Sequence, residues 1–423
     1  MPRMSRSTLF LGLRYLLKKK LSYLAIIGVA VSVGTLIVVM SVMSGFENQL
    51  RSVIRGWLSD VNIQRRTPKI YAFEDWQTVR DETLRVKHVQ AVAPYVLGVG
   101  LVRFGSIEHM SHVFFKGIDP ELEPAVSSLG KEFLRQGSLK DLNKVYLDKN
   151  EAQINACLIG IVMARQTRYD QAPPGTQDVV LVTATGDLER RLKKFVVAGS
   201  YKTGRYDYDS QYVLISLGAA QQFVASGQGV SGLNVKLDDY AHAPAIIKEL
   251  RQKLGPDFFI QTWEEQEWTF LEAVAMERFL MALILTFVGL LAGFCIFAIL
   301  TMMVYEKRRD IGILKAIGYT RLNIALVFLS DGAAIGLLGA SLGVAIGLLF
   351  CWKINQIAGL VERLTGWTPF PQNVYYFDKI PTDTGVAAPV IIACAAVLCS
   401  LIFSVWPAIK ASRLDPVETL RFE

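Results

Sequence analysis

The sequence predicts an α-helical membrane protein with four transmembrane helices and a large mixed α/β extracytoplasmic domain between the first and second of them. Two observations lead to this fold class. First, the 423-residue chain is 52% hydrophobic, and its apolar residues gather in four runs long enough to cross a bilayer. A helix needs about 20 residues for this, because it rises ~1.5 Å per residue through a ~30 Å core. Second, helical and strand-like patterns alternate through the segment between the first two runs.

The four apolar runs cover residues 22–43, 279–305, 324–352 and 386–407. Basic residues precede the first run, as they do in a signal peptide. Its apolar stretch is too long for the hydrophobic part of a signal peptide, however, and the SGFENQL that follows is not a small-residue cleavage site. We therefore expect the first run to be retained as a signal anchor.

The placement of charge predicts how the chain crosses the membrane. Residues 1–21 carry six basic residues and no acid, and the loop 306–322 carries five basic residues against two acids. The segment 45–276 is nearly balanced, with 27 basic and 28 acidic residues. The positive-inside rule then puts both termini and the 306–322 loop in the cytoplasm, with 45–276 outside. The net charge of +7 reflects this topology, so it gives no reason to expect nucleic-acid binding.

The expected organisation follows the chain in order. It comprises a basic amphipathic cytoplasmic helix (1–21), the first transmembrane helix (22–44), the external α/β domain with a helical stalk at each end (45–276), the second transmembrane helix (277–305), a cytoplasmic loop (306–322), the third transmembrane helix (323–352), an outer loop (353–385), the fourth transmembrane helix (386–408) and a cytoplasmic tail (409–423). The stalks are residues 44–58 and 262–280, the second with Thr262 as its capping residue. Two continuous helices of this kind would transmit motion between the membrane and the domain.

Within the α/β segment, strand-like and helix-like runs stand out. The strand-like runs are 61–64, 92–104, 112–118, 178–184, 194–201, 211–216 and 233–237, and the helix-like runs are 74–86, 218–226 and 242–254. The stretch YDQAPPGTQD (169–178) is rich in turn residues and predicts a loop.

Motifs for nucleotide, metal and nucleophilic chemistry are missing from the sequence. No stretch matches the P-loop pattern GxxxxGK[ST], and no GxSxG is present. The four histidines, His88, His109, His112 and His242, are too few and too scattered along the chain to predict a metal site. We therefore predict that the chain is not an enzyme by itself and has no catalytic residue, cofactor site or metal site of its own.

Small residues recur at four-residue spacing in the second and third apolar runs, a pattern that lets transmembrane helices approach closely. The candidate packing residues are Gly289, Gly293, Gly332, Gly336, Gly339, Gly343 and Gly347. Asp331 stands apart, because a carboxylate deep in a span costs about 2.5–3.5 kcal/mol on insertion scales. We interpret Asp331 as lying near the cytoplasmic end of its span, with its side chain reaching the interface. The alternative is a partner for it inside a complex.

The stretch EKRRDIGILKAIG (306–318) places five consecutive charged residues directly after the second apolar run. Its later part has helical spacing and a broad apolar stripe formed by Ile311, Ile313, Leu314 and Ile317. A short helix of this kind at the cytoplasmic face is either a plain topology anchor or a docking element for a cytoplasmic partner. Charge and composition alone do not separate the two.

This order of elements resembles the FtsX/MacB-type permeases of ABC transporters, which have one span, a large external domain and then three spans with such a charged stretch after the second. The terminal WPAIKASRLDPVETLRFE (406–423) is similar to that superfamily's usual ending. Within the superfamily, FVVAGSYKTGRYDYDSQYVLIS (195–216), FKGIDP (115–120) and VYYFDKIP (374–381) are similar to the lipoprotein-releasing permeases of the LolC/LolE type. The resemblance covers essentially the whole chain. It implies a MacB-type periplasmic domain and a multi-pass location in the bacterial inner membrane.

The resemblance also implies partners. Two copies of a separate ABC ATPase would bind ATP and Mg²⁺, and a second permease subunit would complete a homodimer or a heterodimer. The substrate would be a lipoprotein taken from membrane lipid and released to a periplasmic carrier. In the carrier-recruiting member of such a pair an extended hairpin binds the carrier, whereas the hairpin expected over 185–194 is short, so the resemblance puts carrier recruitment on a partner subunit. The residues implied to couple to the ATPase are Glu306, Lys307, Arg308, Arg309, Asp310, Ile311, Gly312, Ile313, Leu314, Lys315 and Ala316.

Two other functions fit the same architecture. One is a MacB-like export permease for peptides or drugs, and the other is an FtsX-like transducer that controls cell-wall hydrolases. MacB carries its ATPase in the same chain, and FtsX-like transducers usually have a smaller external domain. The sequence therefore favours lipoprotein release by mechanotransmission, in which ATP binding moves the coupling helix, the stalks and the external domain.

Overall fold

The computed structural model describes residues 20–66, 73–105, 110–130, 133–147, 151, 153–184, 190–224, 227–367 and 379–415. The chain divides into two compact units. The helical unit comprises Met1–Glu47, Glu272–Phe370 and Lys379–Glu423, and the α/β unit comprises Asn48–Leu271 and Pro371–Asp378. The amphipathic helix expected over 1–21 lies outside the described residues apart from its last two, and so does the end of the tail, 416–423.

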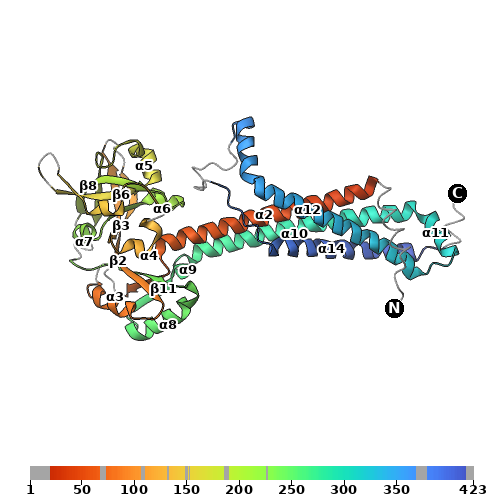
Figure 1. Ribbon diagram of the computed structural model, residues 1–423, viewed down its shortest axis with the longest axis horizontal. Helices are drawn as coiled ribbons and strands as arrows, with labels where there is room; N and C mark the ends of the chain where they lie inside the picture. The colour runs from red at the N-terminus through yellow and green to blue at the C-terminus, as the bar shows by residue number, and fades with distance from the viewer. Residues whose placement is uncertain are drawn as a thin grey trace. The chain divides into compact units, whose positions relative to one another are not determined.

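Four long helices form the described part of the helical unit (Figure 1). They are α2 (Lys20–Leu58), α10 (Trp268–Glu306), α12 (Arg321–Thr365) and α14 (Ala387–Ser412). Each is long and apolar enough to cross a membrane, judged by length and composition. Helices suit this environment because they satisfy all of their backbone hydrogen bonds internally. A short helix, α11 (Arg308–Ala316), stands between α10 and α12 in the sequence.

Glycines allow the long helices to approach one another closely. A Cβ added at Gly332 would lie 2.4 Å from the Cβ of Ser404 on α14, and one at Gly339 would lie 2.7 Å from the Cβ of Val29 on α2. An added Cβ would also meet a neighbouring helix within 3.1 Å at Gly293, Gly336, Gly343 and Gly347. Gly289 differs, since an added Cβ would meet nothing within 4 Å. A larger side chain therefore finds room at Gly289 and at none of the other candidate packing glycines.

The α/β unit is built from one mixed sheet and the helices around it. The strands are β1 (Val61–Arg65), β2 (Val89–Phe104), β3 (Met110–Ile118), β4 (Leu134–Gln136), β5 (Val145–Leu147), β6 (Gln153–Gly160), β7 (Asp178–Ala184), β8 (Arg190–Tyr201), β9 (Tyr212–Ser216), β10 (Gly232–Leu237) and β11 (Phe258–Thr262). The α-helices are α3 (Trp76–Leu84), α4 (Glu123–Val126), α5 (Ile161–Thr167), α6 (Tyr206–Gln211), α7 (Leu217–Val224), α8 (Ala243–Leu254) and α9 (Trp263–Gln266). Short 3-10 turns are η1 (Ser128–Gly130), η2 (Leu139–Asn143), η3 (Tyr169–Gln171) and η4 (Tyr240–His242).

The strand pairing closes part of the sheet on itself. The order is β11-β1-β10-β2-β3-β9-β6-β8-β4, with β5 paired to β6. Strand β7 pairs with both β2 and β8, so the path β2-β3-β9-β6-β8-β7 returns to β2. A closed path leaves its strands without free edges along the paired stretches. The long strand β2 joins the closed part to the open part, because its first half pairs with β10 and its last residues pair with β7.

Two buried clusters stabilise the α/β unit. The larger one includes Phe115, Phe195 and Phe223 among many aliphatic residues of the sheet and of α7 and α8. The smaller one contains Trp57, from the last turn of α2, packed with Tyr201 and other residues. Burying each large apolar side chain contributes about 1.5–3 kcal/mol to folding. The end of α2 is therefore part of the core of the α/β unit.

Candidate functional site

One face of α11 packs on the ends of the long helices. Ile311 is 3% exposed and enters a buried cluster with residues of α10, α12 and α14. The other buried members are Met303, Val304, Ile324, Phe328, Ala408 and Ala411. Lys315 Nζ donates hydrogen bonds of 2.6 Å to the carbonyl oxygens of Ser412 and Leu414, where α14 ends. A cation is favourable there, because a helix C-terminus has unpaired carbonyls and a partial negative charge.

Charged side chains around the start of α11 interact with residues near them in the sequence. Lys307 Nζ lies 2.7 Å from Asp310 Oδ2, and the guanidinium of Arg308 lies 4.0 Å from the centre of the Tyr305 ring. Glu306 is exposed. Partly exposed helix pairs of this kind contribute only about 0.2–0.5 kcal/mol. The position of α11 on the ends of the long helices therefore depends mainly on Ile311 and Lys315.

Another face of α11 leaves apolar side chains exposed. Ile313 is 43% exposed and Ile317, directly after the helix, is 73% exposed. Ala316 and Arg309 are exposed too, whereas Leu314 is half-buried against the cluster around Ile311. We call Arg309, Ile313, Ala316 and Ile317 the outer face of α11, since their spacing of three and four residues puts them on one side. An apolar surface with a cation beside it has the chemistry of a protein docking site.

A cavity of about 240 Å³ lies in the helical unit between α2, α10 and α14. Its lining is almost entirely apolar and consists of Val29, Ser32, Val33, Leu36, Leu285, Thr286, Gly289, Leu290, Ala292, Gly293, Ile296, Ile392, Ala395, Ala396, Cys399 and Ser400. Gly289 leaves its part of the wall open, as the empty space around its added Cβ indicates. Such a cavity suits a hydrocarbon chain, because burying each CH₂ is worth about 0.8 kcal/mol.

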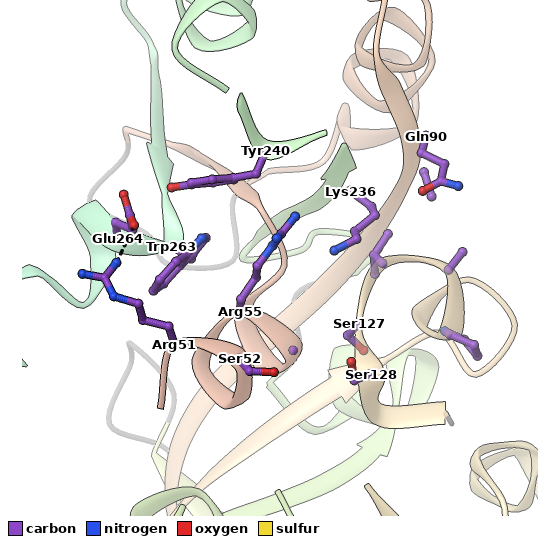
Figure 2. A pocket seen from close by; sticks show the side chains of 15 residues that line it. Arg51, Ser52, Arg55, Gln90, Ser127, Ser128, Lys236, Tyr240, Trp263 and Glu264 are labelled. Atoms are coloured by element: carbon purple, nitrogen blue, oxygen red, sulfur yellow. Dashed lines mark hydrogen bonds and ion pairs between the residues drawn. The ribbon is translucent and has the colours of Figure 1, made fainter. Parts of the chain in front are cut away.

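A larger pocket, of about 800 Å³, lies in the α/β unit and is lined by residues of α2, β10, α9 and neighbouring segments (Figure 2). Three of the side chains that line it, Arg51, Arg55 and Lys236, are cations. Arg51 pairs with Glu264 at 2.8 Å (Figure 2), and Lys236 pairs at 3.2 Å with the buried Asp60, which Arg55 also contacts. Three cations thus face two carboxylates. This pocket suits a polar or anionic group, in contrast to the apolar cavity of the helical unit.

The motif GRYDYDS (204–210) contacts the end of α2 and the start of α10. The Tyr208 ring stacks on Trp57 with centres 5.0 Å apart, and its hydroxyl donates to Glu267 Oε1 at 3.1 Å. Arg205 Nη1 donates to Glu267 Oε2 at 3.1 Å, and its guanidinium lies 4.5 Å from the centre of the Phe270 ring. Burial raises the pKa of Tyr208, which keeps its hydroxyl a donor. We call these five residues the stalk clamp.

Asp209, in the same motif, is buried and holds the loop before α6. Its carboxylate accepts hydrogen bonds from the Thr203 N–H at 2.8 Å, the Thr203 hydroxyl at 2.9 Å and the Gly204 N–H at 3.3 Å. Burial raises the pKa of Asp209 from 3.8 to about 6, although the hydrogen bonds from Thr203 and Gly204 act in the opposite direction.

The raised pKa of Asp209 predicts a pH dependence of stability. The folded chain binds this proton more tightly than the unfolded chain, so the stabilisation is fully present below about pH 4 and is lost as the pH rises through about 6. The free energy of unfolding should fall by on the order of 3 kcal/mol across that window through this group. Unfolding followed by tryptophan fluorescence at several pH values measures the change. Asp209→Asn should remove this slope and the exposed Asp207→Asn should keep it; an unchanged slope in Asp209→Asn contradicts the assignment.

The side chain of Asp331 is buried within the helical unit. It is 1% exposed, and both carboxylate oxygens lack a hydrogen-bond partner among the described residues. Helix α12 begins at Arg321, so Asp331 lies about 15 Å along the helix axis from its start. This burial contradicts the expectation that the Asp331 side chain reaches the interface, whereas the position of Asp331 near the cytoplasmic end of the span stays a prediction. A partner for it inside a complex stays a prediction.

Sequence reasoning missed several residues that the structure brings to these sites. Ile317, which the sequence places in the apolar stripe but not among the coupling residues, belongs to the outer face of α11, and its position four residues after Ile313 is the signal for it. Glu267 and Phe270 carry no local signal, because they meet the GRYDYDS motif only in the folded chain. His88 and His242, although distant in the sequence, lie with ring centres 4.0 Å apart.

Comparison with known proteins identifies both units. The FtsX-like permease C-terminal family matches residues 282–416, and the MacB-like periplasmic core domain family matches residues 22–253. Together with the four long apolar helices, these matches confirm the predicted fold class, with a MacB-like α/β domain between the first two helices.

Whole-chain relatives narrow the assignment. The chain is 30% identical to the lipoprotein-releasing system transmembrane protein LolC of Neisseria meningitidis, over 98% of this chain and 99% of that protein. It is 28% identical to LolC of Xylella fastidiosa over 98% of both chains, and 25% identical to LolE of Haemophilus influenzae over 93% of this chain and 92% of that one. The chain therefore belongs to the LolC/LolE-type lipoprotein-releasing permeases of the FtsX/MacB superfamily.

Proposed function

We propose that this chain is the membrane subunit of an ABC transporter that extracts lipoproteins from the outer leaflet of the bacterial inner membrane and releases them to a periplasmic carrier. Two copies of a separate ATPase hydrolyse ATP, and a second permease subunit, identical or homologous, completes the complex. Both termini lie in the cytoplasm and the α/β unit lies in the periplasm. The observation that carries this proposal is α11, which presents an apolar outer face while its inner face is packed on α10, α12 and α14.

Coupling begins at α11 in this proposal. The ATPase binds the outer face, and closure of the ATPase dimer moves the helix together with the residues that seat it. Because Ile311 and Lys315 tie α11 to the ends of three long helices, the displacement passes into those helices. Helices α2 and α10 continue without a break to the stalk clamp, so the α/β unit receives the motion as well. The close glycine contacts of α12 keep the helices moving together.

The lipid chains of the substrate occupy the apolar cavity between α2, α10 and α14. Exposing a chain to water costs about 0.8 kcal/mol per CH₂, so release without ATP is negligible. The cavity supports a lipid substrate because its lining offers almost no hydrogen-bonding groups. Movement of α2 and α10 changes the width of this cavity and expels the chains.

The cavity provides a test of the substrate with a matched control. Gly289→Leu adds a side chain into open space at the cavity wall, and Gly28→Leu adds the same side chain into open space on α2 at a position that does not line the cavity. Each variant replaces the chromosomal copy, and outer-membrane lipoproteins in the fractionated inner membrane are quantified. We expect Gly289→Leu to retain lipoproteins there to nearly the level reached on depletion of the protein, and Gly28→Leu to resemble the parent.

The same depletion separates the alternative functions. If lipoproteins do not accumulate in the inner membrane on depletion, lipoprotein release is wrong. Increased sensitivity to exported peptides or macrolides would then favour a MacB-like exporter, and a division or wall-hydrolysis defect would favour an FtsX-like transducer.

A further inference from the structure

Three side chains that can bind a metal ion come together at one end of the β2–β10 pair. His88 directly precedes β2, Asp238 directly follows β10, and His242 ends η4 just before α8. The pairing of Val89 with Leu237 brings the first two together. The Asp238 N–H also donates to the His88 carbonyl at 3.1 Å, which fixes the two backbones relative to each other.

The geometry of the three side chains is close to that of a binding site. His88 Nδ1 lies 2.7 Å from Asp238 Oδ2, and His242 Nδ1 lies 3.4 Å from Asp238 Oδ1. The two imidazole rings stack at 22°, and one ligand atom from each of the three residues lies within 4.8 Å of the others. Ligand atoms about 2.0–2.2 Å from a Zn²⁺ ion lie roughly 3–4 Å from one another. The ligand atoms are therefore near enough to share one ion once the two stacked rings rotate so that a nitrogen lone pair of each points at it.

Hydrogen bonding alone leaves part of this arrangement unexplained. His242 Nδ1 is buried and has no hydrogen-bond partner among the described residues, although Asp238 Oδ1 lies only 3.4 Å away. His88 has φ +71°, a left-handed conformation that few residues other than glycine adopt. A metal ion would give His242 Nδ1 a partner. It would also account for the left-handed backbone of His88, which sets the direction in which the His88 ring extends.

We propose that His88, Asp238 and His242 bind one Zn²⁺ ion, with water completing a tetrahedral shell. Two imidazoles and a carboxylate suit borderline divalent ions, whereas Mg²⁺ and Ca²⁺ prefer shells of oxygen ligands. The side chains are 30%, 51% and 43% exposed, so the ion can enter from solution. The bound ion joins the start of β2 to the end of β10 and to α8. This site is independent of the proposed lipoprotein release.

The test uses the full-length chain in detergent after removal of metal with a chelator. Calorimetric titration with ZnCl₂ measures affinity and stoichiometry, and CoCl₂ reports coordination geometry through its visible absorption. The variants are His88→Asn, which keeps a residue type that tolerates positive φ, and His242→Gln. The control is His112→Gln, which alters an exposed histidine on β3 that is outside the cluster.

We expect one equivalent of Zn²⁺ per chain, a tetrahedral Co²⁺ spectrum and a rise in melting temperature on adding Zn²⁺, since an ion that binds only the folded chain stabilises it. All three signals should be lost in His242→Gln and His88→Asn and kept in His112→Gln. If His88→Asn does not fold, the Zn²⁺ binding of His242→Gln alone tests the proposal. The absence of stoichiometric binding by the parent chain, or equal binding by His242→Gln, overturns the proposal.

Discussion

A chain carrying Ile313→Asp and Ile317→Asp is expected to lose its ATPase partner while keeping its fold. Both side chains are exposed on the outer face of α11, so the fold does not depend on their burial. A docked ATPase would bury them, and each buried isoleucine contributes about 1.5–3 kcal/mol. Their replacement by carboxylates also puts desolvated charge at the interface. At 1.4 kcal/mol per tenfold change in affinity, the double variant should bind at least roughly 100-fold more weakly.

Co-purification of the ATPase with the tagged chain, together with thermal unfolding, measures the two parts of this expectation. Leu147→Asp is the matched control, because it exchanges another exposed apolar side chain for aspartate in the α/β unit and should leave binding unchanged. Ile311→Ala should behave in the opposite way to the double variant, losing about 2–5 kcal/mol of stability because it opens a cavity in the cluster that seats α11. If the double variant recovers as much ATPase as the parent chain, the ATPase does not bind the outer face of α11 and the coupling role of α11 is wrong.

The fold class was predictable because the membrane imposes a strong physical signal. A long apolar run with at most one charged residue has few alternatives to a spanning helix, so α10, α12 and α14 follow directly from the sequence. In the α/β unit, the runs over β3, β7, β9 and β10 show the expected strand character. Strand β6 (Gln153–Gly160) was missed, since it is buried on both faces over most of its length and has no alternation to detect.

The sites were less predictable than the fold, because they depend on which way side chains face. The stretch 306–318 was recognisable as a coupling candidate, but its composition does not distinguish the inward Ile311 from the outward Ile313 and Ile317. Only packing against α10, α12 and α14 separates them. The burial of the Asp331 side chain is unpredictable for a related reason, because it depends on which neighbouring helices pack around α12.

Contacts between distant segments account for the remaining differences. His88 and His242 are far apart in the sequence, and they meet because β2 pairs with β10. The stalk clamp likewise joins Trp57, Arg205 and Glu267, which lie in three separate stretches of the sequence. No local pattern encodes such pairings, since they depend on sheet register and on how the stalk helices enter the core.

Arg205→Ala is expected to uncouple lipoprotein release from ATP hydrolysis. The substitution removes the contact of the guanidinium with the Phe270 ring and its hydrogen bond to Glu267, a partner that is 19% exposed. A hydrogen bond to a charged group contributes about 1.5–3 kcal/mol, so the start of α10 loses much of its attachment to the GRYDYDS motif. The ATPase still docks on α11 and still hydrolyses ATP. The displacement that it produces, however, is no longer delivered to the α/β unit, and release per ATP should fall at least about tenfold, the factor that corresponds to 1.4 kcal/mol.

Reconstituted complexes separate this outcome from simple loss of fold, because ATP hydrolysis and the transfer of lipoprotein to a soluble carrier are measured on the same sample. Asp207→Ala is the matched control: it removes another ion pair of Arg205, at 3.3 Å, but one with an exposed carboxylate, and such pairs contribute about 0–1 kcal/mol. Asp207→Ala should leave the amount of lipoprotein released per ATP unchanged. Arg205→Lys keeps the charge but lacks the planar group that stacks on Phe270, so it should recover release only in part. If Arg205→Ala lowers hydrolysis and release by the same factor, the clamp supports the fold alone and motion reaches the α/β unit by another route.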